Sequence, residues 1–231
     1  MAMNSCDTNW SRLGFPLMTG LFGPLVRRLW IAKVEGLDNI PDTGPVIICL
    51  NHESYFDFIC FSAVVKRKIH WLAGEKFFQH PVWRWVMRLM GCIRVDRCST
   101  INLGALKEIR HAVSQGGMVA IFPEGTRSSD GRLLRGKPGA AYLALKSGVP
   151  VIPVGISGTY EILSRHDRFP KLHKATIRVG EPLMLSKTGS GKGIDMQRIT
   201  DEIMLRIADL TGEEYPYAVE EKSKANFAQL L

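Results

Sequence analysis

Short apolar segments that alternate with helix-period segments constrain the fold of this chain more than any other feature. The apolar segments predict strands at 45–50, 69–73, 92–96, 118–122, 149–156 and 175–180. The helical periodicity predicts helices at 54–65, 78–90, 100–115, 137–147 and 194–211. Such alternation is typical of an α/β protein with a largely parallel sheet. Because no internal repeat or linker divides the chain, we expect a single layered domain with a largely parallel (mixed) central sheet flanked by helices.

Three regions are expected along the 231 residues, of which 45% are hydrophobic. Residues 1–32 form an N-terminal segment, residues 33–211 form the α/β domain, and residues 212–231 form a charged, peripheral tail. A chain of this length and composition is long enough to bury one core of ordinary size.

The N-terminal segment is predicted to be helical and to associate with a membrane. Its uncharged part, Leu13 to Val26, is shorter than the roughly 20 residues that span a bilayer. Prolines and glycines are expected to interrupt it, at Pro16, Gly20, Gly23 and Pro24. Tryptophans and arginines near its ends are typical of a segment that lies in the membrane interface; they are Trp10, Trp30, Arg27 and Arg28. The alternative is a helix packed on the domain.

The net charge of +8 is compatible with nucleic acid, an anionic membrane or a phosphorylated small molecule as partner. The sequence contains no RNA-binding signature, zinc-finger spacing or basic tail, so nucleic acid is not expected. The five cysteines include no CxxC pair, which indicates buried thiols in a reducing compartment. The six histidines show no metal-binding spacing, and no metal is expected.

Polar or glycine-rich segments follow four of the predicted strands. In chain order they are "NHESYFD", "DRCS" with Arg97, "FPEGTRS" and "SGTY". In open α/β sheets, ligands bind beyond the carboxyl ends of the strands. The four segments therefore predict one functional rim.

His52 and Asp57 are the candidates for a catalytic pair. If His52 precedes a helix and Asp57 lies in its first turn, the aspartate points back towards the histidine. The carboxylate then accepts the Nδ1 proton, and Nε2 is free to act as a general base. The alternatives are a structural histidine and a capping box, because Ser54 to Asp57 has the S-x-x-D form. The catalytic and capping roles are compatible, since a carboxylate has two oxygens.

The turn formed by Glu124, Gly125, Thr126 and Arg127 is suited to binding a phosphate. It combines backbone N–H groups, a hydroxyl and a guanidinium, and Gly125 permits close approach of the backbone. Glu124 could hold an arginine or a substrate hydroxyl. Lys137, at the start of a predicted helix, opposes the helix dipole unless an anion lies nearby. The alternatives are a surface turn with an exposed Glu–Arg ion pair and a solvated lysine.

The order of these blocks resembles the glycerolipid acyltransferases, the family that contains 1-acylglycerol-3-phosphate acyltransferase. His52 to Asp57 matches its HxxxxD motif, and "GCIRVDR" is similar to its Gly-x-Ile-x-x-x-Arg block, which ends at Arg97. "FPEGTRS" matches its Phe-Pro-Glu-Gly-Thr-Arg-Ser block, "GKPGAAYLA" resembles the next segment, and "VPVIPVGISG" is similar to its Val-Pro-(apolar)-Ile-Pro-Val block. The match covers roughly Pro41 to Gly158. HxxxxD alone is a weak signal, whereas FPEGTR is a strong one.

The resemblance implies an O-acyltransferase of phospholipid biosynthesis. His52, oriented by Asp57, would deprotonate the hydroxyl of a lysophospholipid acceptor, 1-acylglycerol-3-phosphate. That hydroxyl would attack the thioester of acyl-CoA or acyl-carrier protein without forming a covalent acyl-enzyme. Arg97 and residues 124–127 would hold the glycerol phosphate, and neither a metal nor a cofactor is implied. The family also implies association with the phospholipid surface of a membrane, at its cytoplasmic face.

One departure from the family pattern concerns the acceptor. Gly74 stands where many members have the lysine of Ala-Lys-x-Glu-Leu, and Lys76 lies near their glutamate. Lys76 supplies the phosphate contact from a shifted position, or the acceptor is glycerol-3-phosphate or another lipid hydroxyl. A non-enzymatic phospholipid-binding membrane module is a further alternative and would not need the His52–Asp57 pair. A serine hydrolase is disfavoured, because Ser157 lacks the G-x-S-x-G spacing.

Overall fold

The computed structural model describes residues 9–96, 103–185 and 195–218. Its centre is a seven-stranded sheet in the order β1-β7-β6-β2-β5-β3-β4. The strands are β1 (Ile31–Glu35), β2 (Val46–Leu50), β3 (Ile69–Gly74), β4 (Ile93–Val95), β5 (Met118–Ile121), β6 (Val151–Ser157) and β7 (Ala175–Val179). Only β6 and β7 pair antiparallel, so β1 and β7 run against the other five strands.

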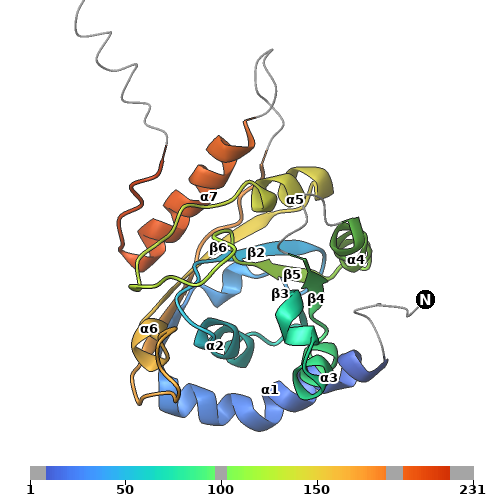
Figure 1. The fold of residues 1–231 in the computed structure, drawn as a ribbon. Helices are drawn as coiled ribbons and strands as arrows, with labels where there is room; N and C mark the ends of the chain where they lie inside the picture. The colour runs from blue at the N-terminus through green and yellow to red at the C-terminus, as the bar shows by residue number, and fades with distance from the viewer. Residues whose placement is uncertain (1–8, 97–102, 186–194, 219–231) are drawn as a thin grey trace, which may run out of the picture.

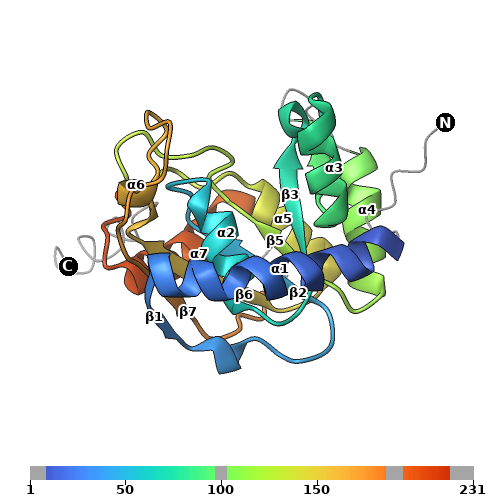
Figure 2. The same cartoon turned by 90° about the horizontal axis from the view of Figure 1, so that it is seen from below.

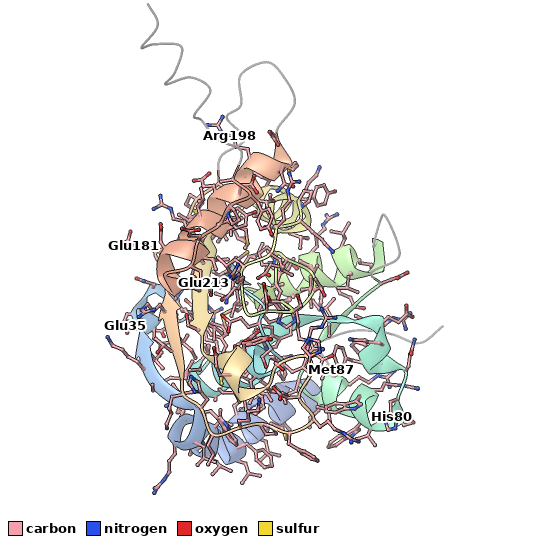
Figure 3. All side chains as sticks on the ribbon, turned by 60° about the vertical axis from the view of Figure 1, so that its left-hand side comes forward. Glu35, His80, Met87, Glu181, Arg198 and Glu213 are labelled. Atoms are coloured by element: carbon pink, nitrogen blue, oxygen red, sulfur yellow. The ribbon has the colours of Figure 1, made fainter. Side chains whose placement is uncertain are left out.

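Helices cover both faces of this sheet (Figure 1). On one face lie α4 (Leu103–Ser114), α5 (Gly139–Ser147) and α7 (Met196–Thr211). On the other lie α1 (Asn9–Trp30) and α2 (Phe56–Val64), and α3 (Pro81–Leu89) packs against α1 beside the β4 edge. Short helical turns follow three strands: η1 (Leu37–Asn39), η2 (Glu75–Phe78) and α6 (Thr159–Ile162). In Figure 3, Glu35 and Glu181 lie at the β1–β7 side of the molecule, opposite His80 beside α3.

The alternating side chains of β2 fill two cores, one on each face of the sheet. Ile48 and Leu50 pack with the α1–α2 side, whereas Ile47 and Cys49 pack with the α4–α5–α7 side. All residues of β2 are buried, because successive side chains of a strand point to opposite faces and both faces are covered. This explains why the central strands are continuous apolar runs in the sequence.

The predicted fold class is confirmed: the protein is a layered α/β domain with a mixed central sheet. Each of the six predicted strands is present, with ends within two residues of those expected. The sequence analysis missed β1 and α6. β1 is a five-residue edge strand that is only partly buried, so its sequence lacks a continuous apolar run.

The expectation that prolines and glycines interrupt the N-terminal segment is wrong. Residues 9–30 form one helix, with both Pro16 and Pro24 inside it. Tertiary packing overrides the local preference: a Cβ on Gly14 would lie 2.3 Å from a Leu89 atom, and Gly23 lies close to Ala63 of α2. The glycines thus let α1 approach α3 and α2. Among the helices of the described ranges, none is long and apolar enough to cross a membrane.

Part of the predicted peripheral tail packs on the domain. Tyr215 is buried, and its hydroxyl donates to Asp201 of α7 and accepts from the backbone N–H of Gly136. Glu213 accepts from the backbone N–H of Leu133. These contacts secure the long connection between β5 and α5. Residues 219–231 lie outside the described residues.

Candidate active site

The predicted rim lies at one edge of the sheet. Strands β2, β3, β4, β5 and β6 run in the same direction, so their carboxyl ends meet at this edge. The edge holds the segments that begin at Asn51 after β2, Phe122 after β5 and Gly158 after β6. Arg97, the residue predicted to follow β4, lies outside the described residues.

His52 and Asp57 meet as the sequence predicted. Nδ1 of His52 lies 2.9 Å from Oδ2 of Asp57, and both side chains are buried. Because the carboxylate can only accept, Nδ1 carries the proton and Nε2 holds a lone pair when the ring is neutral. Within the described part of the chain, Nε2 makes no hydrogen bond. The pair therefore has the arrangement of an oriented general base.

Asp57 also organises the start of α2. Its Oδ2 accepts from the backbone N–H groups of Glu53 and Ser54, each at 2.9 Å. The helix begins at Phe56 with Tyr55 as N-cap, one residue later than the capping box predicted. Ser54 accepts from the N–H of Phe56 and donates to the carbonyl of Leu163. One carboxylate thus contacts both the helix start and His52, so the structural and the catalytic interpretations of Asp57 are compatible.

The ring and backbone of His52 are held by the segment after β5. Phe122 stacks on the imidazole with ring centroids 3.8 Å apart and planes inclined by 15°. Glu124 accepts from the N–H of His52 at 2.8 Å, and the N–H of Ser128 donates to the carbonyl of His52 at 2.8 Å. This segment therefore fixes both the plane of the imidazole and the path of the chain that carries it.

Glu124 does not face outward. Its second oxygen accepts from the N–H of Leu134 at 3.0 Å, so both carboxylate oxygens are occupied by backbone donors. Burial raises the pKa of Glu124 to about 8, and its bonds to the N–H groups of His52 and Leu134 oppose that shift. Glu124 thus joins the segment after β2, which contains His52, to the part of the β5–α5 connection that contains Leu134. Its predicted contact with a substrate hydroxyl stays a prediction.

Cationic side chains gather around Tyr55, next to the catalytic pair. The guanidinium carbon of Arg127 lies 3.7 Å from the centroid of the Tyr55 ring. Nζ of Lys76 lies 3.2 Å from the Tyr55 hydroxyl and also lies over the Phe77 ring. The shifted lysine noted in the sequence and Arg127 therefore contact the same aromatic side chain.

The remaining predicted residues of the turn lie close by. Gly125 has a φ of +68°, and a Cβ there would lie 3.1 Å from Nζ of Lys137. The side chain of Lys137 thus extends along the turn, and its backbone N–H donates to the carbonyl of Pro123. Thr126 is exposed. The helix α5 begins at Gly139, so Lys137 precedes it.

A second buried carboxylate lies behind the pair, and the sequence analysis gave it no role. Glu53 accepts from Nδ2 of Asn51 at 3.0 Å and from the N–H of Tyr160 at 3.2 Å. The hydroxyl of Thr159 lies 3.2 Å from Glu53 and also donates to Oδ1 of Asp57. These residues stand in "NHESYFD" and "SGTY", but no sequence pattern showed that the two segments touch.

The described residues contain no group of three His, Cys, Asp or Glu side chains that could hold a metal ion. The site instead consists of an oriented imidazole, a buried carboxylate and nearby cations at the rim of a parallel sheet. Fold and site together define a layered α/β protein with a histidine–aspartate base.

The comparisons with known proteins identify the family. The chain belongs to the Acyltransferase family, whose profile matches residues 31–157. It is 36% identical over 155 residues to the chloroplastic 1-acyl-sn-glycerol-3-phosphate acyltransferase BAT2 of Brassica napus, a match that covers 62% of this chain and 44% of that protein. The chloroplastic relative LPAT1 of Arabidopsis thaliana is 32% identical over 155 residues, 62% of this chain and 43% of the relative. The chain thus spans less than half the length of these curated relatives.

A solved structure shares the fold. The crystal structure of the 1-acyl-sn-glycerophosphate (LPA) acyltransferase PlsC from Thermotoga maritima superposes with a TM-score of 0.69 at 27% identity. The match covers 86% of this chain and 80% of that one. The resemblance drawn from the order of the sequence blocks is therefore confirmed at the level of family and fold.

Proposed function

We propose that this protein transfers a fatty acyl group from an acyl thioester to the sn-2 hydroxyl of 1-acylglycerol-3-phosphate, which yields phosphatidic acid for phospholipid biosynthesis. The observation that carries the proposal is the bond between Nδ1 of His52 and Asp57, which leaves Nε2 available, while Arg127 and Lys76 both contact Tyr55 of the same segment. The names of the related proteins support the same acceptor.

The proposed reaction is a direct acyl transfer. Nε2 of His52 takes the proton of the acceptor hydroxyl as its oxygen attacks the thioester carbonyl carbon. Asp57 stabilises the imidazolium that forms. The carbon–sulfur bond of the tetrahedral intermediate then breaks, the ester carbonyl re-forms, and the imidazolium proton neutralises the leaving thiolate. His52 returns to its neutral form, so no metal or cofactor is needed.

The cations around Tyr55 are proposed to bind the acceptor phosphate. Arg127 follows β5 and Lys76 follows β3, and both contact Tyr55. Lys137 lies along the turn that contains Gly125. Gly125 has no side chain, so a ligand can approach the backbone of that turn closely, although the N–H of Gly125 itself donates to the carbonyl of Phe122. Arg97 stays a predicted fourth contact. We further propose that the donor is acyl-CoA or acyl-carrier protein.

The first test is acyl transfer by the detergent-purified protein. Labelled acyl-CoA is offered with lysophosphatidic acid and, separately, with glycerol-3-phosphate; acyl-carrier protein replaces CoA in a parallel arm. We expect phosphatidic acid from lysophosphatidic acid, and a loss of at least about 100-fold in kcat for His52→Ala. Product from glycerol-3-phosphate alone would assign the alternative acceptor. Activity retained by His52→Ala would contradict the mechanism.

The same variant distinguishes an enzyme from a non-enzymatic phospholipid-binding module. An enzyme without His52 loses turnover but keeps its affinity for vesicles that contain the acceptor. Wild-type protein that binds such vesicles, yet makes no product with either acceptor and either donor, would favour the binding module. A Lys76→Met variant should raise KM for the phosphate-bearing acceptor more than it lowers kcat, if Lys76 contacts the phosphate.

We also propose that α1 lies on a membrane, at its cytoplasmic face. Four leucines at intervals of four residues form an exposed stripe along α1: Leu13, Leu17, Leu21 and Leu25. Such spacing places side chains on one side of a helix. Figure 2 shows α1 lying across the near face of the molecule. Trp83 and Trp85 of the neighbouring α3 are also exposed, at 53% and 63%. An apolar helix face next to tryptophans favours an interfacial position.

One of the two arginines near the end of α1, Arg27, has structural contacts as well. The guanidinium of Arg27 donates to the carbonyls of Ala63 and Val64, which end α2. Arg27 therefore holds α1 against the domain, and the membrane-facing and packed-helix interpretations apply to different sides of the same helix. The buried thiols of Cys49 and Cys60 are free, which fits the reducing side of a membrane.

Vesicle sedimentation tests this proposal. Leu17→Glu with Leu21→Glu should reduce binding to anionic vesicles at least about tenfold, because each charge disfavours burial of the stripe in the interface. Leu205→Glu, on α7 across the sheet, is the matched control, since Leu205 is an exposed leucine on the opposite layer. Equal binding by the two variants would show that α1 is not the membrane-binding face.

A further inference from the structure

The hydrogen bonds behind the catalytic pair require more protons than two ionised carboxylates allow. The hydroxyl of Thr159 lies between Oδ1 of Asp57 and Oε2 of Glu53, within hydrogen-bond distance of both. A threonine hydroxyl carries one proton, and an ionised carboxylate only accepts. One of these two contacts therefore lacks a proton unless a carboxyl group supplies it.

The other partners of the two carboxyl groups indicate which one holds the extra proton. Oδ2 of Asp57 accepts from three N–H donors, those of His52, Glu53 and Ser54, so this carboxyl group is used as an acceptor. Each oxygen of Glu53 has a single N–H donor, from Asn51 and Tyr160, both uncharged. No lysine or arginine of the described ranges forms an ion pair with Glu53.

We propose that Glu53 is a neutral carboxylic acid that donates to Thr159, and that Thr159 in turn donates to Asp57, so that both are positioning residues for His52. The proton path is then continuous: Oε2–H of Glu53 to Oγ1 of Thr159, Oγ1–H of Thr159 to Oδ1 of Asp57, and Nδ1–H of His52 to Oδ2 of Asp57. The positions of these protons do not depend on the proposed acyl transfer; only the expected effect on the reaction rate rests on it.

Electrostatics agrees with the proton count. Burial raises the pKa of Glu53 to about 9, and the negative charges of Asp57 and Glu213 add to that shift. The N–H of Tyr160 and the hydroxyl of Thr159 act in the opposite direction. The charges that act most strongly on Glu53 are thus those of Asp57 of α2 and Glu213 after α7, and both are acidic. His52 lies beyond Asp57.

A neutral Glu53 has a consequence for the base. Thr159 has one hydroxyl proton, and a protonated Glu53 leaves that proton to Oδ1 of Asp57. An ionised Glu53 would compete for the same proton and release Oδ1. Thr159 holds Oδ1, so that Oδ2 stays directed at Nδ1 of His52.

Infrared spectroscopy tests the protonation state without any activity assay. The protein is studied at pH 7 in a maltoside detergent, which has no ester carbonyl to mask the carbonyl stretch of a protonated carboxylic acid. We expect a carboxylic acid component in the wild type that is lost in Glu53→Gln and retained in Glu124→Gln. Glu124 is the matched control, because it is equally buried but both its oxygens accept from backbone N–H groups. Any acid signal from Glu124 itself, whose pKa burial raises to about 8, would be removed by Glu124→Gln alone.

The Glu53 component should decrease in the wild type as the pH is raised through about 9, the value to which the pKa of Glu53 is shifted. The same titration of Glu124→Gln isolates that component and remains decisive if Glu53→Gln fails to fold. A wild-type spectrum without an acid band at pH 7, or a band unchanged in folded Glu53→Gln, would overturn the proposal.

Kinetics tests the effect on His52. Thr159→Val keeps the size of the side chain and removes the hydroxyl; we expect a loss of about 10- to 100-fold in kcat, with a much smaller change in KM, because a hydrogen bond to a charged group is removed. Thr159→Ser keeps the hydroxyl and should restore most of the activity. As the pH is raised through about 9, ionisation of Glu53 should lower kcat of the wild type. This alkaline decrease should be absent from Glu53→Gln, which cannot ionise.

The outcomes separate this inference from the proposed function. If the wild type catalyses no acyl transfer, the function is wrong, and the infrared result still decides the state of Glu53. If the wild type is active but Thr159→Val matches Thr159→Ser, or Glu53→Gln keeps the alkaline decrease, the positioning roles are wrong and the acyl transfer stands.

Discussion

Replacing Asp57 by asparagine should separate the catalytic charge of this residue from its structural role. An asparagine with its oxygen at the position of Oδ2 can still accept from the N–H groups of Glu53 and Ser54 and from Nδ1 of His52. Its amide nitrogen would then face the hydroxyl of Thr159, which can accept. The start of α2 is therefore expected to survive, while the negative charge beside the imidazole is lost.

The size of the effect follows from the geometry. Unit charges 2.9 Å apart attract by about 6 kcal/mol at an effective dielectric constant of 20, which corresponds to a rate factor of about 10⁴. The carboxylate charge is shared by two oxygens and is partly compensated by its N–H donors, so the expected loss in kcat is about 10²- to 10⁴-fold. The melting temperature should change little.

Asp57→Ala is the matched comparison. It removes the charge and also leaves the buried N–H groups of Glu53 and Ser54 without their acceptor, at a cost of about 1–3 kcal/mol each. We therefore expect both variants to lose activity, but only the alanine variant to lose much stability. Acyl transfer to lysophosphatidic acid and thermal unfolding measure the two effects. A folded Asp57→Asn protein with kcat within about tenfold of the wild type would refute the role of the charge.

Three further predictions concern the surroundings of the site. Gly125→Ala should raise KM for the acceptor and lower stability by about 1–3 kcal/mol, because its φ is positive and the new Cβ would displace Lys137; steady-state kinetics with an unchanged KM would contradict this. Glu53 should lower the free energy of unfolding by up to about 1.4 kcal/mol per pH unit between roughly pH 5 and pH 9, since its raised pKa makes the folded state bind the extra proton there, and Glu124 should add to the fall up to about pH 8; denaturant titrations should show a smaller slope for Glu53→Gln. Tyr215→Phe should cost about 1–3 kcal/mol in stability at unchanged kcat, because Asp201 loses a buried donor; equal melting temperatures would contradict this.

Much of the fold was readable from local patterns. The central strands are buried on both faces, so each is a short apolar run, and their helices carry an apolar periodicity. The edge strand β1 escaped detection because a strand exposed on part of its surface needs no such run. The course of α1 was mispredicted, because residues that disfavour an isolated helix are tolerated where Gly14 and Gly23 allow neighbouring helices to approach.

The sequence by itself determined the contact between His52 and Asp57, since they are close in the chain and a helix start brings them together through local geometry. It also determined the order of the motifs, and with it the family. Tertiary structure alone decided what lies behind and beside the pair. Thr159 is 102 residues from Asp57, and Glu124 is 72 residues from His52. Contacts over such separations depend on which strands become neighbours in the sheet, and periodicity and spacing along the chain carry no record of that order.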